Sequence, residues 1–252
     1  MNPIKKFIYQ YGIPLVGRLF HGKNKLINVI YYHDIVRGEG HSFQQTNIDV
    51  FKRQMEYIAR QGYKTLRFDD LNEETLKFDS KSILIAFDDG WKSNYTEIYT
   101  FMKSLGIKYN IYLAVREIGE NPDYLTWEQV QQMHNEGLVG FGAHTYTHAD
   151  MTDISQIDPK VEFDKADSIF RKHLGYQPLD FCYPYGKYSE EANTYIIRHT
   201  PYKHIYTSRM MYSYKQEGKV VFGRCGINND ESFSVFKAKL KGNFNVFAKL
   251  IG

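Results

Sequence analysis

Runs of apolar and β-branched residues alternate with amphipathic segments along most of this chain, and that alternation limits the fold more than any other feature. Six or seven of the runs have the length and composition of buried strands. They cover residues 26–35, 82–87, 109–115, 139–144, 179–184, 204–209 and 220–227. Strands separated by helices predict an α/β fold with parallel strands and helical crossovers. The pattern alone fits a barrel and an open sheet equally.

Six segments between or after these runs carry helix signals. Thr126 is followed three residues later by Gln129, which forms a capping box. Asp158 stands before a proline at the first helical position. Apolar residues at helical spacing, ended by Gly106, predict one continuous helix before that glycine. The expected helices cover residues 47–62, 94–106, 125–137, 158–175, 189–199 and 232–242.

The chain has no linker rich in proline or serine and no internal repeat. We therefore expect a single domain over residues 26–252, preceded by a basic segment, residues 1–25. The net charge of +3, from 32 basic and 29 acidic residues, is too balanced to indicate a nucleic-acid partner. The two cysteines, Cys182 and Cys225, are too few for a disulfide framework.

The basic segment does not resemble a secretory signal. It starts with Lys5 and Lys6, but Gln10 and Arg18 interrupt its apolar run and no small-residue cleavage site follows. We therefore expect a protein that is cytoplasmic or peripheral to the inner face of the membrane. An ordinary helix packed on the domain is the favoured interpretation of this segment. The alternative is a basic amphipathic helix that lies on an anionic membrane surface.

Polar and conformationally special residues follow four of the predicted strands. His33 ends the first strand, residues 88–90 read Asp-Asp-Gly, residues 144–148 read His-Thr-Tyr-Thr-His, and residues 184–186 read Pro-Tyr-Gly. The carboxyl ends of parallel strands meet at one edge of a sheet, where α/β proteins gather their function. We expect these residues to form one site.

The adjacent acids Asp88 and Asp89 cannot both face one site while the strand is regular, because side chains alternate along a strand. The chain must therefore turn here, and Gly90 permits the turn. Two neighbouring carboxylates at one site can then divide the work. One holds a metal ion, and the other takes a proton from the attacking water.

His144 and His148 are candidate metal ligands. They stand four residues apart in a segment that we expect to be a loop, because glycines precede it and it contains two threonines. Two imidazoles and one carboxylate, with Asp89 as the candidate, make a three-ligand set with an open position, which is typical of catalytic metal sites. A pair of surface histidines is the alternative.

The motifs IAFDDG, HTYTH and YPYG, in this order, resemble the polysaccharide deacetylases of the NodB-homology group, similar to carbohydrate esterase family 4. The resemblance spans roughly residues 26–240. It implies a distorted (β/α) barrel and a metal-dependent enzyme that removes N-acetyl groups from amino sugars. Zinc is the implied metal, and Co²⁺, Ni²⁺ or Fe²⁺ also suit two histidines and an aspartate.

The resemblance also implies roles for individual residues. Asp88 is the general base, and Asp89, His144 and His148 are the metal ligands. The backbone N–H of Tyr185 helps to hold the oxyanion of the intermediate. The implied substrate-binding residues are Trp91, Tyr146, Tyr183, Pro184 and Arg224. For Trp91 and Tyr183, packing beneath the site is an equal alternative.

The chain departs from the family pattern in two places. Cys182 stands where the family usually carries an arginine that orients the base. Arg224, on the next predicted strand, is a candidate substitute for that arginine. The favoured interpretation of Arg224 is nevertheless a structural or surface ion pair. The late Leu-x-His that supplies the general acid is absent. His33 is the candidate replacement, with a core histidine as its alternative, and a protonated Asp88 is a second source of the proton.

The leading function is a hydrolase that acts on an N-acetylated polysaccharide, oligosaccharide or lipid-linked glycan and releases acetate. A phosphoryl-transfer enzyme of the haloacid-dehalogenase type needs one residue between its two acids, so adjacent Asp88 and Asp89 disfavour it. The remaining alternative is a catalytically impaired carbohydrate-binding protein on the same fold. Metal analysis and acetate release separate it from the hydrolase.

Overall fold

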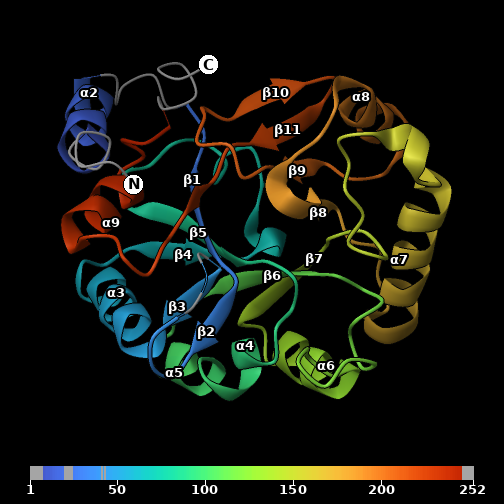
Figure 1. Ribbon diagram of the computed structural model, residues 1–252, viewed down its shortest axis with the longest axis horizontal. Coiled ribbons are helices and arrows are strands. Elements are labelled where there is room, and N and C mark those ends of the chain that lie inside the picture. Colours follow the sequence, from blue (N-terminus) through green and yellow to red (C-terminus); the bar gives the residue numbers. More distant parts are fainter. Residues whose placement is uncertain (1–7, 20–24, 41, 43, 246–252) are drawn as a thin grey trace.

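A curled sheet of ten strands forms the centre of the computed structural model, which describes residues 8–19, 25–40, 42 and 44–245 (Figure 1). Its order is β10-β11-β9-β8-β7-β6-β5-β1-β12, and β4 also pairs with β5. The strands are β1 (Asn28–Tyr32), β4 (Lys64–Leu66), β5 (Ser82–Phe87), β6 (Tyr109–Leu113), β7 (Val139–Ala143), β8 (Asp180–Cys182), β9 (His204–Tyr206), β10 (Tyr214–Gln216), β11 (Lys219–Phe222) and β12 (Cys225–Gly226).

All pairs in this sheet are parallel except β10 with β11. Within the described residues β10 and β12 end the sheet without pairing with each other, so the barrel is distorted and incomplete. A separate parallel pair joins β2 (Asp34–Val36) to β3 (Gln45–Asn47). The predicted α/β fold, a distorted (β/α) barrel with parallel strands and helical crossovers, is confirmed.

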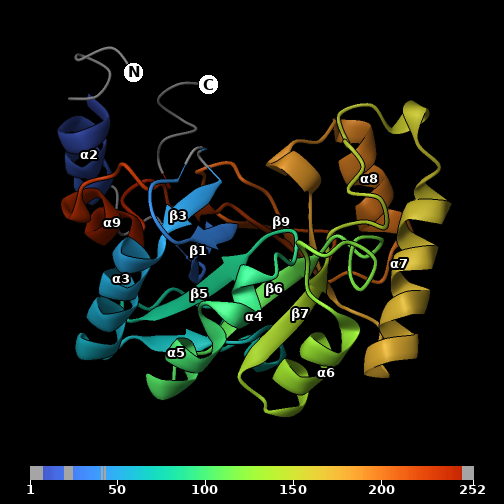
Figure 2. The same cartoon turned by 60° about the horizontal axis from the view of Figure 1, so that its bottom comes forward.

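The helices lie around the outside of the sheet (Figures 1 and 2). The α-helices are α2 (Ile13–Leu19), α3 (Ile48–Arg60), α4 (Ser93–Thr96), α5 (Tyr99–Ser104), α6 (Trp127–Asn135), α7 (Pro159–Leu174), α8 (Glu190–His199) and α9 (Phe233–Leu240). Single turns of π or 3₁₀ type form η1 (Ile8–Gly12), η3 (Phe68–Asp70), η4 (Ile154–Gln156) and η5 (Pro184–Gly186).

The predicted helix starts are confirmed where capping residues marked them. Thr126 accepts a hydrogen bond from the Gln129 backbone, and Gln129 reaches back to Thr126, which completes the capping box of α6. Asp158 caps α7, whose first residue is a proline, and Ser189 caps α8.

Three predicted elements are interrupted. The run 220–227 divides into β11 and β12, which lie near opposite ends of the sheet. The helix expected over 94–106 is wrong as a single unit, because α4 ends at Thr96 and α5 begins at Tyr99. The run 26–35 divides at His33 into β1 and β2, which belong to different sheets. The pattern also missed β3, β4 and β10, each only three residues long and so too short to show a period.

Two apolar layers pack on the two faces of the sheet, and β5 contributes to both. Ile83, Ile85 and Phe87 belong to the layer shared with the helices, whereas Leu84 and Ala86 belong to the layer inside the curl. Side chains alternate along a strand, so Asp88 lies on the same face as Leu84 and Ala86, and its carboxylate points into the mouth of the barrel.

The described part of the basic segment, residues 8–19, forms η1 and α2, and α2 lies beside α9 (Figures 1 and 2). The rest of that segment, residues 1–7 and 20–24, lies outside the described residues. Among the described helices, none has the length and apolarity of a membrane-spanning helix.

Candidate active site

A cavity of about 200 Å³ opens where β1, β5 and β7 end and where the turn after β8 begins. It is lined by the polar residues that the sequence placed at these strand ends. They include His33, Asp88, Asp89, His144, His148 and Tyr185. Four strand ends thus deliver their side chains to one small space, as the parallel topology requires.

Asp89, His144 and His148 bring three metal-ligand atoms together at the wall of this cavity. The Oδ1 atom of Asp89 lies 3.4 Å from Nε2 of His144 and 3.2 Å from Nε2 of His148. Two ligand atoms about 2.0–2.1 Å from a zinc ion, at the tetrahedral angle, are about 3.3 Å apart. The three residues therefore fit a divalent cation with a fourth position left for water or substrate.

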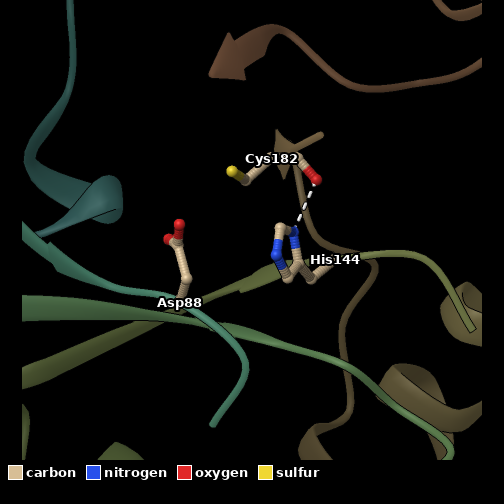
Figure 3. A group of neighbouring side chains, drawn as sticks. All are labelled: Asp88, His144 and Cys182. Atoms are coloured by element: carbon tan, nitrogen blue, oxygen red, sulfur yellow. Dashed lines mark hydrogen bonds between the residues drawn. The ribbon is translucent and has the colours of Figure 1, made fainter. Parts of the chain in front are cut away.

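Neighbouring groups orient these ligands. Nδ1 of His144 lies 2.7 Å from the carbonyl oxygen of Cys182 (Figure 3), so Nδ1 carries the proton and Nε2 keeps its lone pair for a metal. Nε1 of Trp91 donates to Oδ2 of Asp89 at 2.9 Å, which leaves Oδ1 to face the two imidazoles.

The loop between the two histidines is organised by Glu162 of α7. Its carboxylate accepts hydrogen bonds from the backbone N–H groups of Tyr146 and Thr147 and from the Thr147 hydroxyl, at 2.7 to 3.0 Å. Glu162 is buried. This buried carboxylate fixes the turn that brings His148 back toward His144.

Backbone strain is concentrated around the cavity. Among the described residues, five that are not glycine have a positive φ. Four of them belong to the site motifs: Asp89 (74°), Thr145 (62°), His148 (59°) and Tyr185 (57°). Such angles cost free energy and persist only where surrounding contacts enforce them, which is common at functional sites. Gly90 completes the turn with φ 87°, and an added Cβ there would lie 2.9 Å from Leu113 and Ile118 side-chain atoms.

Asp88 pairs with an arginine, whereas Asp89 faces the imidazoles of His144 and His148. Arg224, fully buried between β11 and β12, donates from Nη1 to Oδ1 at 2.7 Å and from Nη2 to Oδ2 at 2.8 Å. The Tyr31 ring lies 4.1 Å from the guanidinium, on which it stacks. Burial raises the pKa of Asp88, but the Arg224 charge and hydrogen bonds more than offset it, so the pKa lies below its usual range.

A second group of potential ligand atoms comprises Asp88, His144 and Cys182 (Figure 3). It suits a metal less well than the first group. Both oxygens of Asp88 already bind Arg224, and Nη2 of Arg224 also donates to the Cys182 sulfur at 2.9 Å. Burial raises the pKa of the Cys182 thiol well above its usual range, which disfavours the thiolate that a metal needs.

His33 and Tyr185 complete the cavity. Nε2 of His33 lies 3.8 Å from Oδ2 of Asp88, and burial lowers the pKa of this imidazole. Tyr185 is exposed, and its ring lies 4.6 Å from that of His148. Among the described residues, no acceptor takes the Tyr185 backbone N–H, which leaves it available to a ligand.

Three members of the predicted substrate-binding set, Tyr183, Pro184 and Arg224, are buried, which disfavours direct contact with a sugar. Tyr183 packs on Tyr188 and donates to Asn193, and Arg224 binds Asp88. Arg224 is fully buried and pairs with Asp88, so the surface interpretation of its ion pair is wrong, whereas a structural ion pair and an orienting role both fit this contact.

Trp91 and Tyr146 remain partly exposed but lie outside the lining of the cavity. Trp91 stacks on Tyr124 and binds Asp89, so it supports a ligand. Tyr146 lines a separate hollow beside α6 and α7. The sequence did not indicate that Trp91 supports Asp89. It gave no sign of the role of Glu162 either, because an acid inside a helix pattern gives no signal of what it binds.

A family model described as polysaccharide deacetylase matches residues 75–205. The protein YxkH of Bacillus subtilis is 28% identical over 167 residues, which cover 65% of this chain and 58% of that relative. A peptidoglycan-N-acetylglucosamine deacetylase of Bacillus cereus is 24% identical over 181 residues, which cover 68% of this chain and 62% of the relative. The chain thus spans less than two thirds of the length of these relatives.

The crystal structure of a polysaccharide deacetylase from Bacillus cereus shares the fold, with a TM-score of 0.74 at 20% identity over 86% of this chain and 69% of that one. The family model covers more than half of the sequence and includes the strands that end at Asp88, His144 and Cys182. On this match, the chain belongs to the polysaccharide deacetylase family.

Proposed function

We propose that this protein is a metal-dependent hydrolase that removes the N-acetyl group from an N-acetylated amino sugar of a glycan and releases acetate. The observation that carries the proposal is the division of the twin acids: Asp89 faces two imidazole nitrogens, and Asp88 faces a buried arginine. The name of the Bacillus cereus relative supports N-acetylglucosamine as the sugar.

Asp89, His144 and His148 would hold the cation. When bound, a divalent ion, with zinc as our proposal, supplies a Lewis acid that polarises the acetamide carbonyl and acidifies water. The hydrogen bonds to Cys182 and Trp91 keep the His144 and Asp89 ligand atoms aimed at one point. Preorganised ligands of this kind need no rearrangement during turnover.

Asp88 takes the proton from the attacking water in this proposal. Its pKa, lowered by Arg224, keeps the carboxylate ionised at neutral pH, and each oxygen that accepts from Arg224 retains a second lone pair. The free N–H of Tyr185 donates to the oxygen on which negative charge develops. The Asp88 carboxylate thus serves the attack of water on the amide carbon, and the Tyr185 N–H serves the negative charge that this attack places on the amide oxygen.

The departing amine needs a proton, and His33 is our candidate to deliver it. Its lowered pKa favours the neutral ring before the reaction, so His33 would act after receiving the proton that Asp88 has taken. The two side chains are 3.8 Å apart, which is longer than a hydrogen bond, so this transfer needs one bridging water or a closer approach. Direct return of the proton by Asp88 is the alternative route.

The proposal is tested by measuring acetate released from N-acetylglucosamine oligomers by the purified chain loaded with Zn²⁺. We expect release that stops on chelation and returns with added metal. A chain that holds its metal and binds the oligomers but releases no acetate would favour the carbohydrate-binding alternative. The pairing of Asp88 with Arg224 supports turnover, because the connection between β11 and β12 supplies an orienting arginine in place of the one that this chain lacks at Cys182.

A further inference from the structure

A stripe of large apolar side chains is exposed on the N-terminal helix. Ile8, Tyr11, Leu15 and Leu19 have exposed fractions of 51, 56, 64 and 77%. They recur every three or four residues through η1 and α2, so they share one face. We call these four residues the apolar stripe. Surface-exposed apolar residues that cluster in this way mark interaction sites more often than single ones do.

The opposite face of the same helix fixes it to the body of the protein. Ile13 and Gly17 are buried, and a Cβ on Gly17 would lie only 1.6 Å from the backbone oxygen of Asn243. Tyr9 donates from its hydroxyl to Oε1 of Glu231 at 2.8 Å. The helix therefore packs on α9 through this face, which leaves Leu15 and Leu19 exposed on the other.

Positive charge surrounds the apolar stripe. A hollow beside Tyr11 and Leu15 is lined by Arg18 of α2 and by Lys237 and Lys241, which lie in and directly after α9, and its lining contains no acidic residue. We call these three cations the basic rim; all three are exposed. The first 25 residues of the sequence contain no aspartate or glutamate. Their cations are Lys5, Lys6, Arg18, Lys23 and Lys25.

We propose that this face docks on the surface of a lipid bilayer that contains anionic lipids. An amphipathic helix of this type buries its apolar residues at the boundary between headgroups and acyl chains, while its cations bind anionic headgroups. The charge argues against a second copy as the occupant, because a two-fold interface would set the basic rim against itself. The inference does not rest on the proposed reaction.

The two interpretations of the basic segment thus describe two faces of one helix. The face with Ile13 and Gly17 packs on the domain, as an ordinary surface helix does. The face with the apolar stripe, beside the basic rim, has the character of a membrane-surface helix.

The test is cosedimentation of the purified full chain with lipid vesicles. We expect binding to vesicles of phosphatidylglycerol and phosphatidylcholine in equal parts, and at least about tenfold weaker binding to phosphatidylcholine alone. Binding should weaken as salt is raised, because salt screens the basic rim. Each cation reversed in the variant Arg18→Glu/Lys237→Glu/Lys241→Glu should weaken binding by about fivefold or more.

The variant Leu15→Glu/Leu19→Glu tests the apolar stripe and should lower vesicle binding by at least about tenfold. Both leucines are mostly exposed, so the unfolding temperature should stay unchanged. Leu179→Glu is the matched control, because this exposed leucine precedes β8, far along the chain from α2, and its change should leave binding intact.

Three results would overturn the proposal. The first is a native chain that does not bind the anionic vesicles. The second is equal binding by the native chain and the Leu15→Glu/Leu19→Glu variant. The third is a dimer in analytical ultracentrifugation that this variant dissociates, without vesicle binding by either protein, since the face would then join two copies of the chain.

Discussion

The two halves of the active site are built in different ways. The half that we propose to hold the metal, Asp89 with His144 and His148, comes from two short motifs, and we call it the ligand half. The base half depends on Asp88 and Arg224, which are 136 residues apart and meet only because β12 pairs with β1 beside β5. The two adjacent acids differ because each faces a different partner: Asp89 faces two imidazole rings, and Asp88 faces a buried arginine.

This difference gives the substitutions distinct signatures. Changes in the ligand half should remove metal and activity together. Changes in the base half should leave the metal bound and alter turnover or its pH dependence.

Asp88→Asn should lower kcat by about 10²- to 10⁴-fold, because it removes the general base. The amide keeps one oxygen for Arg224, so the bound metal should remain at the native level. Acetate release and metal analysis on the same preparation check both expectations. A variant that loses its metal in step with its activity would place Asp88 in the ligand half.

Arg224→Met should move the acid limb of kcat/KM to higher pH by about one to three units. The sign follows from the charge: Arg224 lowers the pKa of Asp88, so its loss lets burial raise that pKa, and the base stays protonated to a higher pH. The unpaired buried carboxylate should also destabilise the fold by about 3–5 kcal/mol.

Arg224→Lys is the matched control for this effect, since it keeps the charge without the paired hydrogen bonds. It should give a smaller shift of the same sign. The measurements are a pH–rate profile and thermal unfolding. An unmoved acid limb in Arg224→Met would show that Asp88 does not titrate as the base.

His33→Gln should lower kcat by about tenfold, less than a sole general acid would, because Asp88 can return its proton directly. Nε2 of His33 lies toward Asp88 and not among the three ligand atoms, so the metal content should not change. Rates on substrates with better leaving amines should recover in this variant. Equal loss for good and poor leaving groups would remove His33 from proton delivery.

Trp91→Phe should have the smallest effect on turnover. The ring can still stack on Tyr124, but Oδ2 of Asp89 loses its hydrogen bond. Loss of such a supporting bond weakens metal binding by about 10- to 100-fold. Competition with a chelator measures this affinity. At saturating metal kcat should be close to native, and a large fall there would mean that Trp91 acts on the reaction itself.

The sequence was sufficient to predict that Asp89, His144 and His148 lie together, because the signals for this cluster are local. An apolar run that ends in two acids and a glycine predicts a strand, a turn and divided roles. The spacing of His144 and His148 adds the remaining ligand candidates. The family motifs predicted the barrel, and its parallel strands bring the strand ends that carry these residues together, as expected.

The sequence was insufficient to predict contacts between residues far apart in the chain, because these contacts depend on how the strands pair. Arg224 gives no local sign that it reaches Asp88, because that contact depends on how the sheet curls. Glu162 lies inside a helix pattern, and only the fold shows that it holds the loop between the histidines. The break between α4 and α5 lies within a pattern that looks continuous.

Metal content measured side by side in the native chain, Asp88→Asn and His144→Ala/His148→Ala separates the roles of the two acids. We expect one equivalent of divalent metal in the native chain and in Asp88→Asn, and almost none in the double histidine variant. No metal in the native chain under saturating Zn²⁺, or equal metal in all three proteins, would contradict the division of labour between the two acids.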